Sequence, residues 1–177
     1  MSLFNQKKQG IHPTFGFMMS HPWHLLSLGF GSGLSPIVPG TMGTVFGSIS
    51  FHLLTKQFPS IFTAITWYVI CAIGFLLGIK ACQFTGDALN SPDSGHMVWD
   101  EIIAMWLILA FLMPTTITDE VIAFVLFRIF DMSKPPPIRW FDRHVHGGFG
   151  VMLDDIVAAI FAIIFFLLYE KMALMFF

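Results

Sequence analysis

Two pairs of adjacent acids stand at the points where this chain turns strongly apolar. Asp100-Glu101 precede the run IIAMWLILAF, and Asp154-Asp155 precede the run IVAAIFAIIFFLLY. A carboxylate at the centre of a bilayer costs about 2.5–3.5 kcal/mol on insertion scales, so four of them would cost on the order of 10 kcal/mol. A chain tolerates such acids where they lie at the water interface, face a polar cavity or hold cations. The two pairs are therefore candidates for a cation-binding site.

Charge is concentrated in two windows of the sequence. The chain has nine lysines and arginines and 11 acidic residues, and twelve of these lie within 87–101 or 128–155. The twelve are Asp87, Asp93, Asp100, Glu101, Arg128, Asp131, Lys134, Arg139, Asp142, Arg143, Asp154 and Asp155. Both windows fall at the ends of expected helices, and helix ends on one side of an antiparallel bundle with short loops meet in space. The clustering predicts one polar site at one face of a membrane.

An acid-rich site that also holds basic side chains suits a phosphate bound through a metal. Mg²⁺ is usually held by one or two carboxylates together with phosphate oxygens. The metal would neutralise the acids, polarise the phosphoryl group and activate water. Basic side chains would hold the other phosphate oxygens, and the candidates are Arg128, Lys134, Arg139 and Arg143. Adjacent residues on a helix point about 100° apart, so one acid of each pair can face the site while its neighbour caps the helix or binds another side chain.

Structural roles compete with these functional ones. A single acid is more often a helix cap or a salt-bridge partner than a ligand. Asp119-Glu120 open an expected helix, and acids in a first turn favour the helix dipole, so this pair is interpreted as structural. Asp87 stays open between the two roles. Three loop histidines are possible proton donors but are usually only solvated; they are His96, His144 and His146.

Composition indicates a membrane protein. Hydrophobic residues make up 55% of the 177 residues and charged residues 11%, with a mean hydropathy of +0.75, whereas an ordinary soluble domain has about 25% charged residues. An exceptionally apolar soluble protein is the alternative. No basic run beyond Lys7-Lys8 supports binding to nucleic acid. Cys71 and Cys82 are interpreted as small buried hydrophobic residues, and no cleavable signal peptide is expected.

The pattern predicts an all-α membrane bundle that forms one domain over residues 1–177, with a polar tail over 1–22. Residues 57–79 give 23 uncharged residues, and a membrane span needs about 20. Other helices are expected at 41–54, 98–112, 119–130 and 151–169. Loops are expected at 23–40, 81–97 and 131–150. About four helices span the membrane, with three or five as alternatives, because 41–54 is not expected to cross fully.

Three tryptophans are expected to act as interfacial anchors rather than as a ligand cage. They are Trp99, Trp106 and Trp140. The chain has no P-loop, no HExxH motif and no GxSxG motif. Ser94-Gly95-His96 matches one motif of the histidine-nucleophile lipid phosphatases, but the upstream and downstream motifs of that family do not occur in register. The triplet is therefore interpreted as a coincidence.

Three blocks of residues over about 31–160 carry a further pattern. The first runs from Gly31 to Pro36 and continues with Pro39-Gly40-Thr41 and Gly43-Thr44. The second is Asp93 with Val98-Trp99-Asp100-Glu101. The third comprises Phe130-Asp131, Lys134-Pro135, Pro137-Ile138, Asp142-Arg143, Gly147-Gly148, Gly150-Val151-Met152 and Asp154-Asp155. Together they resemble the phosphatidylglycerophosphatase A family, with Ser94 where that family commonly has proline.

The resemblance implies an all-helical, magnesium-dependent phosphoric monoester hydrolase of the bacterial inner membrane. It would convert phosphatidylglycerophosphate to phosphatidylglycerol. By position, the candidate catalytic acids are Asp93, Asp100, Glu101, Asp131, Asp142, Asp154 and Asp155. The candidate Mg²⁺ ligands among them are Asp93, Asp100, Glu101, Asp154 and Asp155. Lys134 is the expected catalytic phosphate clamp, and the other substrate-binding candidates are Gly40, Thr41, Arg139 and Arg143. The resemblance identifies no covalent nucleophile, so direct attack by a metal-bound water is expected.

Two other functions stay open at this point. One is hydrolysis of a different lipid phosphate, and the other is non-enzymatic cation transport. A carrier usually places acids near mid-helix and has repeated halves, whereas these acids lie at helix ends and no repeat is visible. Basic residues occur at most helix ends, so the positive-inside rule gives no orientation. The resemblance suggests that the site of a multi-pass protein faces the cytoplasm, and the oligomeric state is not predicted.

Overall fold

A computed structural model describes residues 12–113 and 115–176 of the chain. Over these residues the protein contains helices and no strand. The elements in chain order are α1 (Phe15–Met19), α2 (Pro22–Ser27), the 3₁₀ helix η1 (Gly29–Leu34), α3 (Pro39–Gln57), α4 (Ala64–Ala88), α5 (Trp99–Leu112), α6 (Ile117–Ser133), α7 (Ile138–His144) and α8 (Gly147–Phe176). The predicted all-α fold is confirmed for this part of the chain.

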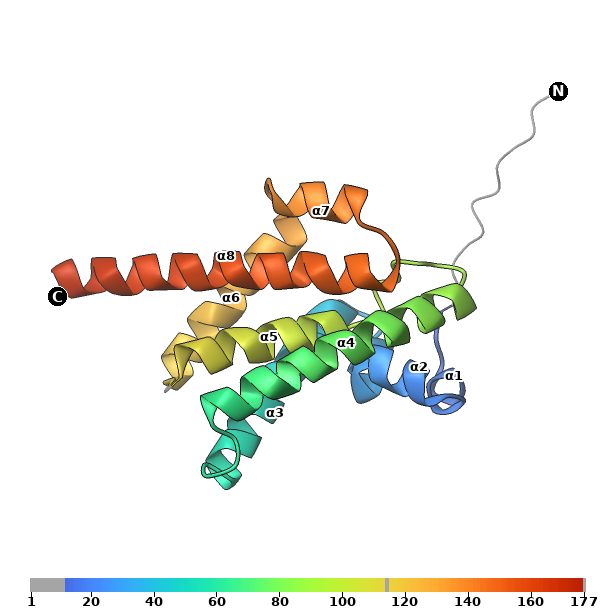
Figure 1. Ribbon diagram of the computed structural model, residues 1–177, viewed down its shortest axis with the longest axis horizontal. Coiled ribbons are helices and arrows are strands. Elements are labelled where there is room, and N and C mark those ends of the chain that lie inside the picture. Colours follow the sequence, from blue (N-terminus) through green and yellow to red (C-terminus); the bar gives the residue numbers. More distant parts are fainter. Residues whose placement is uncertain (1–11, 114, 177) are drawn as a thin grey trace.

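The long helices run back and forth between two ends of the molecule (Figure 1). α5 packs against α3, α4 and α8, and α8 also packs against α4, α6 and α7. Short connections make successive helices antiparallel. As a result, the first turns of α3 and α5 and the third turn of α8 meet the last turns of α6 at one end, which we call the acid end. The last turns of α3 and α5 meet the first turns of α4 and α6 at the other, which we call the far end.

Side-chain caps fix where two of these helices begin. At the start of α4, the Thr63 hydroxyl accepts a hydrogen bond from the N–H of Thr66. At the start of α6, the Thr116 hydroxyl accepts from the N–H of Asp119, and the Asp119 carboxylate accepts from the N–H of Thr116. This reciprocal pattern is a capping box. The structural interpretation of Asp119 is therefore confirmed.

Glycines let two helices approach α5 closely. A Cβ atom at Gly43 of α3 would collide with Val98, and one at Gly74 of α4 would collide with Ile103. Small residues at helix contacts are typical of bundles in membranes, where close backbone approach replaces the hydrophobic driving force.

Two tryptophans of α5 donate hydrogen bonds to backbone carbonyls of α3 and α4, which the glycines leave accessible. The indole N–H of Trp99 donates to the carbonyl of Gly74 at 2.9 Å, and that of Trp106 donates to the carbonyl of Gly47 at 3.0 Å. Trp99 and Trp106 are 5% and 8% exposed. The expectation that they are interfacial anchors is wrong, because their polar atoms find partners inside the bundle. Trp140 is exposed.

Two helices are long and apolar enough to cross a membrane. They are α4 and the stretch Gly147–Met175 of α8. Large apolar side chains are exposed along them, including Leu76 and Leu174, and the C-terminal end of α8 projects beyond the other helices (Figure 1). Extensive exposed apolar surface marks contact with a membrane or a partner. The two helices indicate membrane association.

Helix boundaries differ most from the expectation in α4 and α8. α4 continues to Ala88 instead of ending near residue 79, because Cys82 and Thr85 are buried and α4 packs against α2. Lys80 does not end the helix, since its ammonium group lies 5.2 Å from the centre of the Trp23 ring. α8 begins at Gly147 and reaches Phe176, beyond the expected 151–169. The interpretation of Cys71 and Cys82 as buried, unpaired residues is confirmed.

The expected loops also contain helices. Residues 23–40 hold most of α2 and all of η1, residues 131–150 hold α7, and the expected polar tail holds α1. α2 starts where the ring of His21 accepts a hydrogen bond from the N–H of Trp23 and Pro22 takes the first helical position. Residues 1–11 of the tail lie outside the described residues.

Candidate metal centre and phosphate site

Four segments bring charged side chains to the acid end. α5 carries Asp100 and Glu101 in its first turn, and α8 carries Asp154 and Asp155 two turns after its start. α6 carries Asp131 in its last turn and is capped by Lys134. The connection between α4 and α5 contains Asp93. Residues more than 60 positions apart in the sequence thus come together.

Asp100, Glu101 and Asp155 converge on one point. One carboxylate oxygen of each lies within 4.8 Å of the others. Asp100 and Asp155 are 8% and 4% exposed. One buried oxygen on each of the three (Asp100 Oδ1, Glu101 Oε2 and Asp155 Oδ2) has no hydrogen-bond partner among the described residues.

This carboxylate cluster fits a divalent cation. A buried polar group without a partner costs about 1–3 kcal/mol, and more if it is charged. Three carboxylates at this spacing also repel one another. A hard cation with oxygen ligands would satisfy the unpaired oxygens and offset the repulsion, and Mg²⁺ prefers such ligands. The donor set of Asp100, Glu101 and Asp155 is therefore compatible with Mg²⁺.

Lys134 gives the two acids of the pair Asp154-Asp155 different surroundings, because it binds Asp154. Its ammonium group donates to Asp154 Oδ2 and Asp142 Oδ1, both at 2.5 Å. Burial lowers the pKa of Lys134, but the hydrogen bonds to Asp142 and Asp154 outweigh it and raise the pKa above its usual range. Asp154 thus pairs with a cation, while Asp155 on the next helical position faces the carboxylate cluster.

Arg128 of α6 connects the carboxylate cluster to one more acid, Asp131. Its guanidinium donates to Asp131 Oδ2 at 2.6 Å and lies 3.6 Å from Glu101 Oε1. All three side chains are only 12–14% exposed. Arg128 Nε is buried with no partner among the described residues. A donor of the guanidinium is thus available next to the cluster.

The first turn of α3 closes the site from another side. A Cβ atom at Gly40 would collide with Glu101 Oε1 and would lie 3.4 Å from the Arg128 guanidinium. Only glycine therefore allows this close approach. Thr41 follows in the same turn. N–H groups at the start of a helix attract anions, so the turn places donors beside both the carboxylate cluster and Arg128.

A small pocket opens next to Lys134. Its volume is about 140 Å³, and its lining includes Asp93, Asp142, His146 and Asp154. Asp93 thus joins the site through this pocket rather than through the carboxylate cluster. The pocket gives water and small polar groups access to the acid end.

The family model of phosphatidylglycerophosphatase A matches residues 25–170. The chain belongs to the phosphatidylglycerophosphatase A family. One relative, phosphatidylglycerophosphatase A of Escherichia coli strain K12, is 50% identical over 143 residues, which are 80% of each chain. Phosphatidylglycerophosphatase A of Haemophilus influenzae is 41% identical over 157 residues, 86% of this chain and 91% of the relative.

A third relative has a different name. It is a putative phosphatidylinositol-3-phosphatase of Bacteroides thetaiotaomicron, 34% identical over 148 residues, which are 79% of this chain and 88% of the relative. No solved structure matches the chain. The resemblance to phosphatidylglycerophosphatase A is confirmed, since the matched region contains all three blocks that carry it.

Within this family member, the predicted site residues fall into two groups. The first group is the carboxylate cluster of Asp100, Glu101 and Asp155, with Asp131 and Gly40 beside it and Arg128. The second group is Asp93, Asp142 and Asp154, which line the small pocket, with Lys134 bound to the last two. Both groups meet at α8, where Asp154 and Asp155 are adjacent. The assignment of individual metal ligands and catalytic groups stays a prediction.

Several candidates lie outside these groups. Arg139 and Arg143 are exposed on α7, and Arg139 donates to the carbonyl of Ser133. Asp87 accepts hydrogen bonds from the side chain of Gln83. His96 lies 2.8 Å from the carbonyl of Gly33, and His144 lies 2.8 Å from that of Trp140. The predicted contact of the two arginines with substrate stays a prediction.

Arg128 is the residue that sequence reasoning did not single out. It was one of four basic candidates for a phosphate ligand, and the structure distinguishes it by its contact with Glu101. Its spacing of three residues from Asp131 is the signal in the sequence, because residues at i and i+3 on a helix are neighbours.

Proposed function

We propose that this protein hydrolyses the terminal phosphate ester of phosphatidylglycerophosphate, which gives phosphatidylglycerol and inorganic phosphate. Membership in the phosphatidylglycerophosphatase A family supports this activity, as do the names of the relatives that are 50% and 41% identical. The structural observation that carries the proposal is the cluster of three buried carboxylates beside Arg128.

In this proposal, Asp100, Glu101 and Asp155 hold Mg²⁺, with Asp93 and Asp154 as further acids beside them. Bound Mg²⁺ supplies a Lewis acid for the phosphoryl group and lowers the pKa of a coordinated water. The side chains of the protein position the substrate and compensate the negative charge of its phosphate.

The substrate phosphate lies between the donors of the acid end. Arg128 and Lys134 hold its oxygens by charge-assisted hydrogen bonds, which are stronger than neutral ones. The N–H groups of Gly40 and Thr41 at the start of α3 add donors that favour an anion.

Water, rather than a side chain, attacks the phosphorus atom. The phosphorus–oxygen bond to glycerol breaks, and the leaving oxygen takes up the proton that the attacking water gives up. Asp154 is placed to accept a proton from water in the small pocket, since it lines that pocket and Lys134 fixes its orientation. Asp142 shares the Lys134 ammonium group and supports this orientation.

Phosphate release from a panel of lipids tests the proposal. The purified protein in detergent is expected to release phosphate from phosphatidylglycerophosphate with Mg²⁺ present. The panel also contains phosphatidic acid and phosphatidylinositol 3-phosphate. Absence of release from phosphatidylglycerophosphate with any divalent cation would overturn the proposal.

Hydrolysis of another lipid phosphate is the second candidate. The relative named as a putative phosphatidylinositol-3-phosphatase, 34% identical over most of both chains, favours it. Because the metal and phosphate ligands would be the same, only the relative kcat/KM values on the panel separate the two. A higher kcat/KM on phosphatidylinositol 3-phosphate would favour the second candidate.

We further propose that the protein crosses the bacterial inner membrane several times with its acid end at the cytoplasm. The sequence led to an expectation of about four spans with three or five as alternatives, and the alternation of α3, α4, α5, α6 and α8 between the two ends supports five. α3 has 19 residues and runs from the acid end to the far end, as does α8. An engineered cysteine at Ser133 is expected to react with a thiol reagent only from the cytoplasmic side, and one at Thr115 only from the opposite side. The reverse pattern would contradict this orientation.

A further inference from the structure

We infer that a groove on the outer face of α6 holds an acyl chain of the lipid substrate and leads it to Arg128. The groove has a volume of about 490 Å³ and is lined by Phe124, Val125, Arg128, Ile129, Met132 and Ser133. The inference rests on the proposed function, because it places the apolar part of the same substrate whose phosphate lies at the acid end.

Arg128 connects this α6 groove to the metal centre. Its side chain lines the groove, while its guanidinium contacts Asp131 and lies 3.6 Å from Glu101 of the carboxylate cluster. A phosphomonoester with an apolar tail matches this arrangement, since the cation faces the anionic headgroup and the groove faces the tail.

The length and chemistry of the α6 groove match one leaflet of a membrane. From position 124 to position 133 are nine helical steps of about 1.5 Å, or about 13 Å along the axis. Half of the hydrocarbon core of a bilayer is about 15 Å thick. Val125, Ile129 and Met132 are 48%, 53% and 70% exposed, so the groove offers apolar contacts on both sides of Arg128 along α6.

A second apolar groove serves as the comparison. It lies between α4, α5 and α8, has a volume of about 430 Å³, and its lining includes Tyr68, Leu76 and Ile156. None of the described residues that line it is charged. It therefore offers lipid contact without a charged side chain, and its exposed Leu76 is a matched control position for Ile129.

Filling each groove with tryptophan tests the inference. The variants Ile129→Trp and Leu76→Trp are compared with the unmodified protein on long-chain phosphatidylglycerophosphate and on its deacylated headgroup. Ile129→Trp is expected to lower kcat/KM about tenfold on the long-chain lipid, the discrimination that a few apolar contacts provide, and to spare the deacylated headgroup. Leu76→Trp is expected to change neither value.

An equal loss on both substrates, or the same effect from Leu76→Trp, would overturn the inference. A second measurement does not depend on catalysis. A phosphonate analogue of the lipid with a diazirine in its acyl chain is expected to label residues 124–133 more strongly than residues 68–76, and equal labelling of both would overturn the inference. Failure of the proposed function is distinct, since the unmodified protein would then hydrolyse neither substrate.

Discussion

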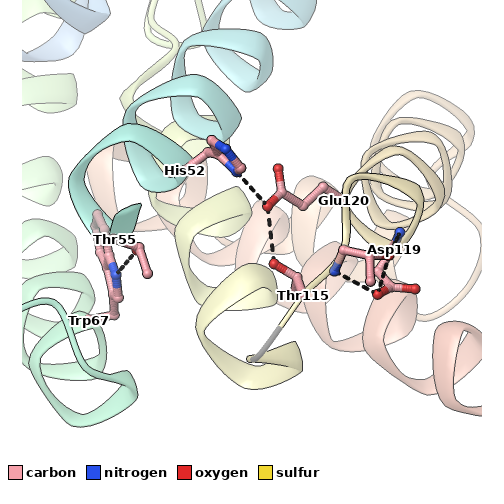
Figure 2. A network of polar contacts seen from close by, with 7 residues as sticks. His52, Thr55, Trp67, Thr115, Asp119 and Glu120 are labelled. Carbon is pink, nitrogen blue, oxygen red and sulfur yellow. Dashed lines mark hydrogen bonds and ion pairs between the residues drawn. The ribbon is translucent and has the colours of Figure 1, made fainter. Parts of the chain in front are cut away.

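Both ends of the helix bundle contain largely buried acids, but the acids at one end have hydrogen-bond partners that those at the other end lack. At the far end, Glu120 accepts hydrogen bonds from His52 Nδ1 at 3.2 Å and from the Thr115 hydroxyl at 3.0 Å (Figure 2). Its side chain is 14% exposed. At the acid end, Glu101 is 12% exposed, yet its Oε2 has no hydrogen-bond partner among the described residues, and neither does one oxygen each of Asp100 and Asp155.

The difference separates acids that hold the fold together from acids available for chemistry. Glu120 joins α6 to α3 through His52, and its Oε1 has two hydrogen-bond partners. Buried polar groups in native proteins are nearly always satisfied, so each exception calls for an explanation. Three exceptions at one point, on two helices, fit the cation site that we propose.

Removal of divalent cations is expected to have the largest effect on phosphate release, and it acts only at the acid end. A chelator should abolish phosphate release, and added Mg²⁺ should restore it, because the proposed cation offsets the repulsion among Asp100, Glu101 and Asp155 and activates the phosphoryl group. Mg²⁺ should also raise the Tm, since a ligand that binds only the native state stabilises it. Full activity in the chelator would contradict the assignment of a metal centre.

Replacement of one acid of the carboxylate cluster comes next in size. Asp155→Asn is expected to lower kcat/KM by more than about 100-fold, because even residues that only support metal ligands typically contribute 10- to 100-fold. The Mg²⁺-dependent rise in Tm should shrink in the same variant. Glu120→Gln at the far end is the matched control and should keep both the activity and the response to Mg²⁺. Near-normal activity of Asp155→Asn would remove Asp155 from the metal centre.

Loss of Lys134 should have an intermediate effect. A hydrogen bond to a charged group contributes about 1.5–3 kcal/mol, so Lys134→Met should lower kcat/KM roughly 10- to 100-fold if that contribution is lost in the transition state. Asp142 and Asp154 would also face each other without the ammonium group between them. Lys134→Arg keeps the charge and is expected to recover part of the activity. An unchanged kcat/KM in Lys134→Met would exclude the role of a phosphate clamp.

The existence of the acid end was predictable from the sequence, but its internal pairing was not. Adjacent acids at the heads of apolar runs, and charge confined to two windows, predict that the helix ends meet. Whether Asp154 or Asp155 faces the carboxylate cluster depends on where Lys134 lies. Lys134 caps α6 with a positive φ of 42°, a conformation that residue patterns rarely reveal outside glycine and asparagine.

Packing between helices was the other feature that the sequence left open. Trp99 and Trp106 carry the signature of interfacial residues, yet glycines on α4 and α3 expose carbonyls that accept their indole N–H groups. The extension of α4 to Ala88 depends in the same way on a neighbour, because α2 buries its last polar turns. Residue type sets which groups need partners, while the tertiary arrangement decides where they find them.

The smallest effect is expected at the far end, where Glu120→Gln tests stability rather than catalysis. The amide oxygen of glutamine can still accept from His52 and Thr115, but the hydrogen bonds lose the charge of the acceptor, which costs about 1 kcal/mol. For a protein of this size, that corresponds to a fall in Tm of about 2–4 °C. Thermal unfolding and phosphate release, measured on the same sample, distinguish a loss of stability from a loss of activity. If Glu120→Gln lost activity with an unchanged Tm, the far end would take part in the reaction, and satisfied hydrogen bonds would no longer distinguish structural acids from functional ones.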